Sequence, residues 1–224
     1  MTPHPYTPPE QTLSGLYLGP EKPDALAILL HGYGANGADL IGLGQQLIAR
    51  LPACGFLAPD APEPLHPLPF GPNARQWFAL SDLSPAELDQ GVQHARALVT
   101  TYIEAALEDF GLRPDRLVLM GFSQGCMLAL EVAPRLAKAV AHVVGFSGAL
   151  AGAARLKDEA MSYPPIFLGH GEADAVVPFA AMGLAEAALK DAGFGVETTA
   201  YPGLGHGIDP QGMGRFYEIL KLLS

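Results

Sequence analysis

The sequence is poor in cysteine and in basic residues, and it contains no long run of apolar residues. Its 224 residues include two cysteines, Cys54 and Cys126, which are too few for a framework of disulfide bonds. The 13 lysines and arginines are outnumbered by 23 acidic residues and form no dense cluster, which argues against nucleic acid as a partner. No apolar run approaches the roughly 20 residues of a membrane-spanning helix, so no stable membrane insertion is expected.

The N-terminal residues also lack the pattern of a secretory signal. Residues 1–10 are rich in proline and show no basic stretch followed by an apolar core. We therefore expect residues 1–12 to form a solvated Pro-rich tail and residues 13–224 to form a single domain. The low cysteine content fits a reducing compartment, and we expect a cytoplasmic protein.

Enough apolar residues are present for a large core, since 49% of the chain is hydrophobic and only 16% is charged. Short apolar runs bounded by glycine or proline are typical of strands buried on both faces of a parallel sheet. Helical patterns lie between them, and the clearest begins at the N-cap Ser84 and ends at Gly111. This alternation predicts a doubly wound α/β sheet with ligands at the carboxyl ends of its strands. The predicted strands are residues 25–30, 53–58, 117–122, 140–146 and 166–168.

One motif points to chemistry, the segment Gly121-Phe122-Ser123-Gln124-Gly125. It follows a predicted buried strand and opens a predicted helix, which is the context of a nucleophile elbow. Glycines on both sides relieve the collisions of such a tight turn, so that the Ser123 hydroxyl is exposed at the end of the sheet. The motif alone is weak evidence, and its strand–turn–helix context is what makes it specific.

A serine nucleophile needs a base and a carboxylate that orients the base, in the chain order Ser, acid, His. His142 lies inside a predicted strand and His170 ends one, whereas His206 lies in a glycine-rich loop that can reach back over the sheet. We therefore predict His206 as the base. Asp174 is the predicted acid, with Glu172 as its rival in the same loop.

The oxyanion of a tetrahedral intermediate also needs donors. The backbone N–H of Gln124 is one candidate, and the N–H of Tyr33, in the glycine-rich loop 31–37, is the other. This loop could also hold phosphate, but neither the P-loop lysine nor the Gly-x-Gly-x-x-Gly spacing is present. We expect His31 to hold the loop by side-chain hydrogen bonds. The histidines show no metal-ligand spacing, and the proposed chemistry requires no metal or other cofactor.

The long proline-rich segment 59–83 is a candidate acyl-binding loop. We predict that Trp77, Phe78 and Phe70 form an apolar wall beside the ester, with Phe179 and Leu204 closing the other side. The alternative is that Trp77 and Phe78 only pin the loop to the sheet. Cys54 and Cys126 are both expected to pack in the core.

Taken together, these motifs resemble the phospholipase/carboxylesterase family of α/β hydrolases, which includes the acyl-protein thioesterases. The resemblance runs from about Leu26 to the end of the chain, and it implies an α/β-hydrolase fold without a large cap domain. It also implies ester or thioester hydrolysis through an acyl-enzyme at Ser123, and homodimers are frequent in the family. The residues that carry it are Leu30-His31-Gly32-Tyr33-Gly34, Arg75-Gln76-Trp77-Phe78, the Ser123 motif, Asp174-Ala175-Val176-Val177-Pro178 and Gly205-His206.

One departure from the thioesterase pattern narrows the expected substrate. Eukaryotic thioesterases of the family usually have His-Gly-Leu-Gly-Asp-x-Gly, whereas this chain has Tyr33 and Ala35 in place of Leu and Asp. This favours the prokaryotic esterase branch and small, fairly apolar acyl esters. The alternatives are a thioesterase or lysophospholipase with a long-chain preference and a non-catalytic binding module on a hydrolase scaffold.

Overall fold

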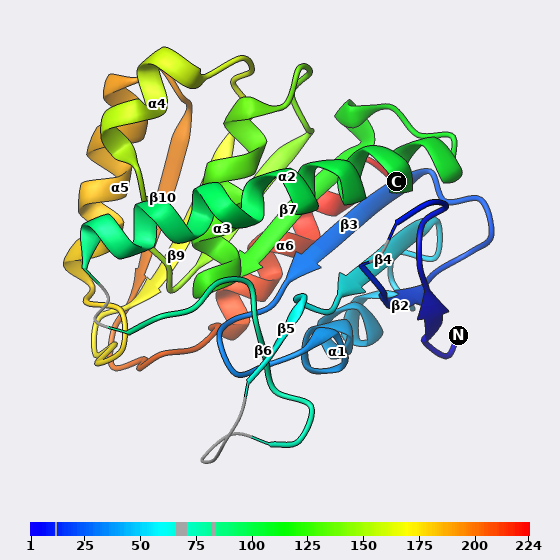
Figure 1. Cartoon of the computed structure of the whole chain (residues 1–224). Helices are drawn as coiled ribbons and strands as arrows, with labels where there is room; N and C mark the ends of the chain where they lie inside the picture. The colour runs from blue at the N-terminus through cyan, green and yellow to red at the C-terminus, as the bar shows by residue number, and fades with distance from the viewer. Residues whose placement is uncertain (12, 66–70, 82–83) are drawn as a thin grey trace.

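A mostly parallel β-sheet forms the centre of the molecule in the computed structural model, which describes residues 1–11, 13–65, 71–81 and 84–224 (Figure 1). Within these ranges an eight-stranded sheet has the order β1-β2-β4-β3-β7-β8-β9-β10. In this order, the six neighbouring strands β4, β3, β7, β8, β9 and β10 are parallel to one another. The pairs β1–β2 and β2–β4 are antiparallel. The strands are β1 (His4–Tyr6), β2 (Gly15–Leu18), β3 (Ala25–Leu30), β4 (Cys54–Pro59), β7 (Leu117–Phe122), β8 (His142–Phe146), β9 (Ile166–Gly171) and β10 (Val196–Tyr201).

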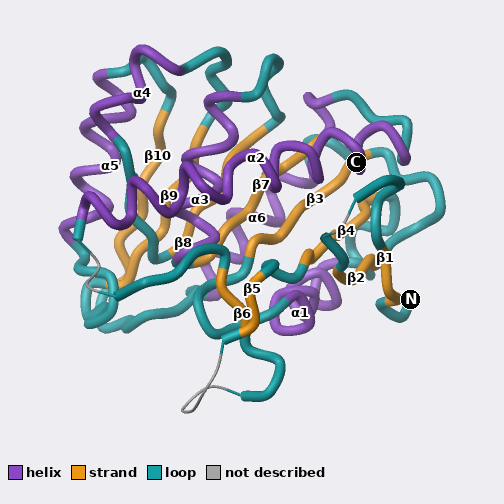
Figure 2. Tube along the Cα trace, in the orientation of Figure 1, coloured by secondary structure: helices purple, strands orange, loops and turns teal. Residues whose placement is uncertain are grey.

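Helices cover both faces of the sheet (Figures 1 and 2). The apolar residues of α1 and α6 pack in one core cluster, and those of α2, α3, α4 and α5 pack in the other. This confirms the predicted α/β-hydrolase fold, and no large cap domain is evident in the described ranges. None of these helices is long and apolar enough to cross a membrane. The helices are α1 (Gly37–Leu47), α2 (Pro85–Asp109), α3 (Gln124–Val132), α4 (Ala153–Glu159), α5 (Ala180–Asp191) and α6 (Pro210–Lys221). A two-stranded ribbon, β5 (Glu63–Pro64) and β6 (Arg75–Gln76), lies outside the main sheet.

The strand β3 shows why the central strands are continuously apolar. Leu26, Ile28 and Leu30 pack in the cluster below α2 and α3, and the intervening residues 25, 27 and 29 pack in the cluster below α1 and α6. Successive side chains of a strand point to opposite faces, so a strand covered on both sides must be apolar at every position.

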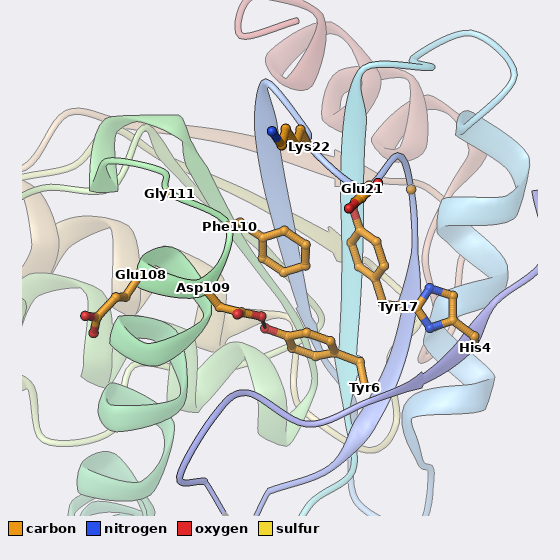
Figure 3. A pocket seen from close by; sticks show the side chains of 10 residues that line it. His4, Tyr6, Tyr17, Glu21, Lys22, Glu108, Asp109, Phe110 and Gly111 are labelled. Atoms are coloured by element: carbon orange, nitrogen blue, oxygen red, sulfur yellow. Dashed lines mark hydrogen bonds between the residues drawn. The ribbon is translucent and has the colours of Figure 1, made fainter.

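The N-terminus differs from the expectation of a solvated tail over residues 1–12. His4–Tyr6 forms the edge strand β1, which pairs with β2. The Tyr6 ring stacks on Phe110 at the end of α2, with ring centroids 5.4 Å apart, and its hydroxyl donates to Asp109 at 2.8 Å. Figure 3 shows these side chains beside Tyr17 at a surface hollow of about 740 Å³. Aromatic contacts therefore fix a segment whose proline content suggested a free tail.

A fully buried carboxylate joins the helices on one face of the sheet. The Glu131 side chain, on α3, lies 3.1 Å from Arg96 of α2, 3.0 Å from Arg135 and 3.2 Å from Arg155 of α4. Such a buried charge is stable only because its partners compensate for the lost hydration. The cluster thus fixes the far end of α3, the helix that begins directly after Ser123.

The half-buried histidine His142 generates a prediction about pH and stability. Its Nε2 atom has no hydrogen-bond partner among the described residues. Burial, followed by the nearby charge of Arg215, lowers the pKa of His142 from 6.5 to about 4, and the opposing effect of Glu197 is smaller. As the pH falls from 6.5 towards 4, the unfolded chain therefore binds a proton before the folded protein does, and stability falls.

We predict that His142→Phe makes the free energy of unfolding less sensitive to pH across this window. Urea unfolding of both proteins, above pH 6.5 and near pH 4, measures the difference. Equal losses of stability in the variant and the wild type would contradict the prediction.

Candidate active site

Ser123 lies in a strained turn between β7 and α3. Its backbone has φ +53° and ψ −117°, a conformation that costs free energy for a residue other than glycine. A Cβ atom on Gly121 would lie 2.3 Å from the Gly125 carbonyl oxygen, and one on Gly125 would lie 2.0 Å from the Leu30 carbonyl oxygen. Both flanking positions therefore require glycine, and the predicted strand–turn–helix geometry is present.

A buried carboxylate contacts the loop histidine. Asp174 Oδ2 lies 2.8 Å from Nδ1 of His206. A carboxylate accepts hydrogen bonds, so Nδ1 carries the proton and Nε2 has a lone pair for a proton from another group. The other oxygen of Asp174, Oδ1, accepts from the N–H groups of Val176 and Val177, each at 2.9 Å. Glu172, the alternative acid, is exposed.

These contacts decide the charge of Asp174. Burial raises the pKa of a carboxyl group, but the hydrogen bonds from His206 and from the two backbone N–H groups outweigh burial, so the pKa of Asp174 is lowered. The carboxylate is therefore ionised near neutral pH and can stabilise a positive charge on the His206 ring.

The loops that carry Asp174 and His206 are packed backbone to backbone. A Cβ atom on Gly171 would lie 2.3 Å from the Leu204 carbonyl oxygen, and Ala173 N–H donates to the same oxygen at 2.9 Å. The His206 ring rests on Phe122, the residue before Ser123, with ring centroids 4.9 Å apart. The structure thus brings the histidine loop onto the turn that holds Ser123.

The glycine-rich loop 31–37 also lies against this turn. A Cβ atom on Gly32 would be 3.2 Å from Cβ of Ser123. Within the loop, His31 Nδ1 donates to the Gly32 carbonyl at 2.8 Å, and His31 Nε2 accepts from Ala61 N–H at 3.0 Å. Burial lowers the pKa of His31, which keeps this accepting nitrogen unprotonated. The prediction that His31 holds the loop is confirmed.

The two predicted oxyanion donors belong to segments that meet at the Ser123 turn. Gln124 is the first residue of α3, where backbone N–H groups have no partner within the helix. Tyr33 follows Gly32 in the loop that packs on Ser123. Their roles as donors stay a proposal.

The aromatic residues of the predicted acyl loop are placed differently from expectation. Trp77 is 0% exposed and Phe78 is 2% exposed. The Trp77 indole N–H donates to the His31 carbonyl at 2.9 Å, and Phe78 occupies a notch that Gly91 leaves in α2. These contacts turn both rings into the core, which favours the alternative that they pin the loop to the domain.

The side chain of Gln124 strengthens this attachment. Its Oε1 accepts from the backbone N–H of Trp77 at 2.9 Å, and its Nε2 donates to the Phe78 carbonyl at 2.8 Å. Phe179 and Leu204, by contrast, are only partly buried and remain candidates for contact with substrate. Phe70 lies outside the described residues.

Two polar residues near the site were not assigned a role from the sequence. Ser147 follows β8 with φ +49°, and its Oγ donates at 3.0 Å to the carbonyl of Gly207, next to His206. His170, near the end of β9, has its Nε2 3.2 Å from Asp174 Oδ2. The sequence feature that could have pointed to them is their position, because both are polar residues at the carboxyl ends of parallel strands, where ligands bind.

Comparisons with known proteins agree with this geometry. Residues 18–224 match the sequence model of the phospholipase/carboxylesterase family. The chain is 30% identical to acyl-protein thioesterase 1 of Yarrowia lipolytica over 69% of this chain and 71% of that protein. It is 29% identical to esterase YpfH of Escherichia coli, with coverages of 87% and 81%. The crystal structure of esterase PE8 superposes with a TM-score of 0.89 at 32% identity, covering 95% of this chain and 99% of that one.

The space around Gly125 and around Gly214 predicts opposite effects on stability when each glycine is replaced by alanine. Gly125→Ala places Cβ against the Leu30 and His31 carbonyl oxygens, so we expect destabilisation by at least about 3 kcal/mol or failure to fold. Gly214→Ala, at an exposed position of α6 with no atom within 4 Å, should stabilise the protein by up to about 1 kcal/mol. Urea denaturation measures both. A Gly125→Ala protein as stable as wild type would contradict the described turn.

Proposed function

Because the chain belongs to the phospholipase/carboxylesterase family and is a hydrolase that acts on esters, we propose that Ser123, His206 and Asp174 cleave carboxylic esters of small, fairly apolar acyl groups. The observation that carries this proposal is the 2.8 Å contact between Asp174 and His206, in a loop that packs on the Ser123 turn. It supplies an oriented base beside a serine that the fold holds at the end of the sheet.

In the proposed reaction, Ser123 Oγ attacks the ester carbonyl carbon while His206 Nε2 takes the hydroxyl proton. The negative charge that forms on the carbonyl oxygen is stabilised by the N–H groups of Gln124 and Tyr33. His206 then gives its proton to the leaving alcohol, and the acyl group remains on Ser123. Water, deprotonated by the same histidine, releases the carboxylic acid and restores the serine. Asp174 stabilises the imidazolium in both steps.

A second activity, thioester or lysophospholipid hydrolysis with a long-chain preference, would use the same residues. The similarity to acyl-protein thioesterase 1 supports it. Tyr33 and Ala35, which replace the usual Leu and Asp of the thioesterase loop, favour the ester proposal instead. A non-catalytic binding module is disfavoured because none of the three reacting residues has been replaced.

The proposed partner is thus a small ester or thioester, and no cofactor takes part in the reaction. Both cysteines are buried free thiols, and burial raises the pKa of Cys126 to about 12, so its thiol is not a competing nucleophile. We place the enzyme in the cytoplasm because its few cysteines suit a reducing compartment. A homodimer remains an expectation from the family resemblance.

The serine assignment predicts that Ser123→Ala lowers kcat for p-nitrophenyl acetate by about 10³-fold or more, because the acyl-enzyme cannot form. A fluorophosphonate reagent should label the wild type and leave the variant unlabelled. Ser224→Ala, at the exposed end of the chain, is the matched control. A Ser123→Ala enzyme that keeps a tenth of wild-type activity would rule out this nucleophile.

The partly buried positions of Phe179 and Leu204 predict a short acyl site. Each buried substrate methylene should add up to about 0.8 kcal/mol, or roughly fourfold in kcat/KM, until the apolar wall ends at short to medium chains. Phe179→Ala should move or flatten the chain-length optimum for p-nitrophenyl esters, whereas Trp77→Ala should mainly reduce stability, by about 3–5 kcal/mol. An optimum that moves in Trp77→Ala and stays fixed in Phe179→Ala would reverse these assignments.

A further inference from the structure

Asp174 has a second histidine beside it that the proposed reaction does not use. His170 lies on β9, one residue before the strand ends, and its side chain is 1% exposed. Its Nε2 atom lies 2.9 Å from the Val177 carbonyl oxygen and 3.2 Å from Asp174 Oδ2. The oxygen beside His170 is therefore the same one that accepts the hydrogen bond from His206.

The partners of His170 decide which ring nitrogen carries a proton. A carbonyl oxygen and a carboxylate oxygen can only accept hydrogen bonds, so the proton is on Nε2. The N–H donates to Val177, and its positive end lies beside the negative Oδ2 of Asp174. This dipole favours the ionised carboxylate and favours the rotamer that aims Oδ2 at His206.

The same contact closes a small ring of hydrogen bonds around the acid loop. The Val177 carbonyl accepts from His170, while the Val177 N–H donates at 2.9 Å to Oδ1 of Asp174. His170 thereby holds the residue whose N–H group binds the carboxylate. Close packing holds His170 in place, since it borders a cavity of only about 10 Å³ that Cys126 and Ser147 also line.

We propose that His170 is a positioning residue that holds Asp174 in line with His206. The inference rests on the proposed function, because it assigns Asp174 as the group that orients the base. His170 cannot itself be the catalytic base, since its side chain is buried and its Nε2 is already bound to the Val177 carbonyl. The His206 side chain, by contrast, is 19% exposed. The proposed effect of His170 on the reaction therefore passes through Asp174.

Two substitutions separate this role from simple packing. His170→Phe keeps the ring shape, including its edge contact with Phe179, but removes the N–H. His170→Gln offers an amide N–H at a similar reach. We expect kcat to fall about 10-fold to 100-fold in His170→Phe with KM changed less than about twofold, and to recover in large part in His170→Gln. His142→Phe, which removes a half-buried histidine of the neighbouring strand β8, is the control and should keep wild-type kcat.

A readout that needs no turnover is the low-field proton NMR signal of the hydrogen bond between His206 Nδ1 and Asp174, identified by its loss in Asp174→Asn. In His170→Phe this signal should shift upfield or broaden, and in His170→Gln it should return towards its wild-type position. If His170→Phe does not fold, His170→Gln is compared with His170→Asn, whose shorter amide cannot reach Val177. A higher kcat and a more wild-type-like NMR signal in His170→Gln than in His170→Asn would then support the proposal, and equal values would overturn it.

Wild-type kcat in folded His170→Phe would overturn the proposal. So would a loss of kcat that leaves the NMR signal unchanged and that His170→Gln does not repair, because that result would show packing alone. Full activity in Ser123→Ala would refute the proposed function instead, and the NMR signal would still decide whether His170 positions Asp174.

Discussion

The site depends on one close approach of backbone to backbone, where Gly125 meets the carbonyl oxygens of Leu30 and His31. A single methyl group at Gly125 would overlap the Leu30 oxygen at 2.0 Å. This contact packs the start of α3 against the end of β3, so it fixes the position of the Ser123 turn relative to the loop 31–37. The histidine and acid loops are placed by contacts at the ends of two further strands, with Phe122 at the end of β7 and Gly171 at the end of β9. A shift at Gly125 would therefore change the position of Ser123 relative to the loop 31–37.

Two buried carboxylates, Asp174 and Glu131, are kept charged in two different ways. Asp174 is held by neutral N–H donors, which leave the site able to accept a new positive charge on His206. Glu131, near the end of α3, instead lies among three arginines that also pair with Glu159 and Asp89, so the charges of the cluster already balance. The first arrangement suits a group that responds during a reaction, and the second suits a fixed support.

Much of this fold could be predicted from local sequence, because the strongest signals are local. The runs at residues 25–30 and 117–122 coincide with β3 and β7, and the N-cap Ser84 begins α2. The strand β10 was not predicted, since it lies at the sheet edge and its polar residues hide the pattern. The sequence left open whether Trp77 turns inward or faces the substrate, because its partner, the His31 carbonyl, lies 46 residues away. The resemblance indicated the family, whereas the contact of His170 with Asp174 needed the structure.

The short strand β1 has a consequence for handling the protein. Its proline, Pro5, has no N–H to offer, and the strand is three residues long, so it is a poor template for the strands of other molecules. It also covers β2, whose Leu16, Tyr17 and Leu18 would otherwise form a longer and more apolar edge. Trimming the proline-rich N-terminus, as is often done to improve crystallisation, would uncover that edge and invite aggregation. A purification tag is better attached with residues 4–6 left in place.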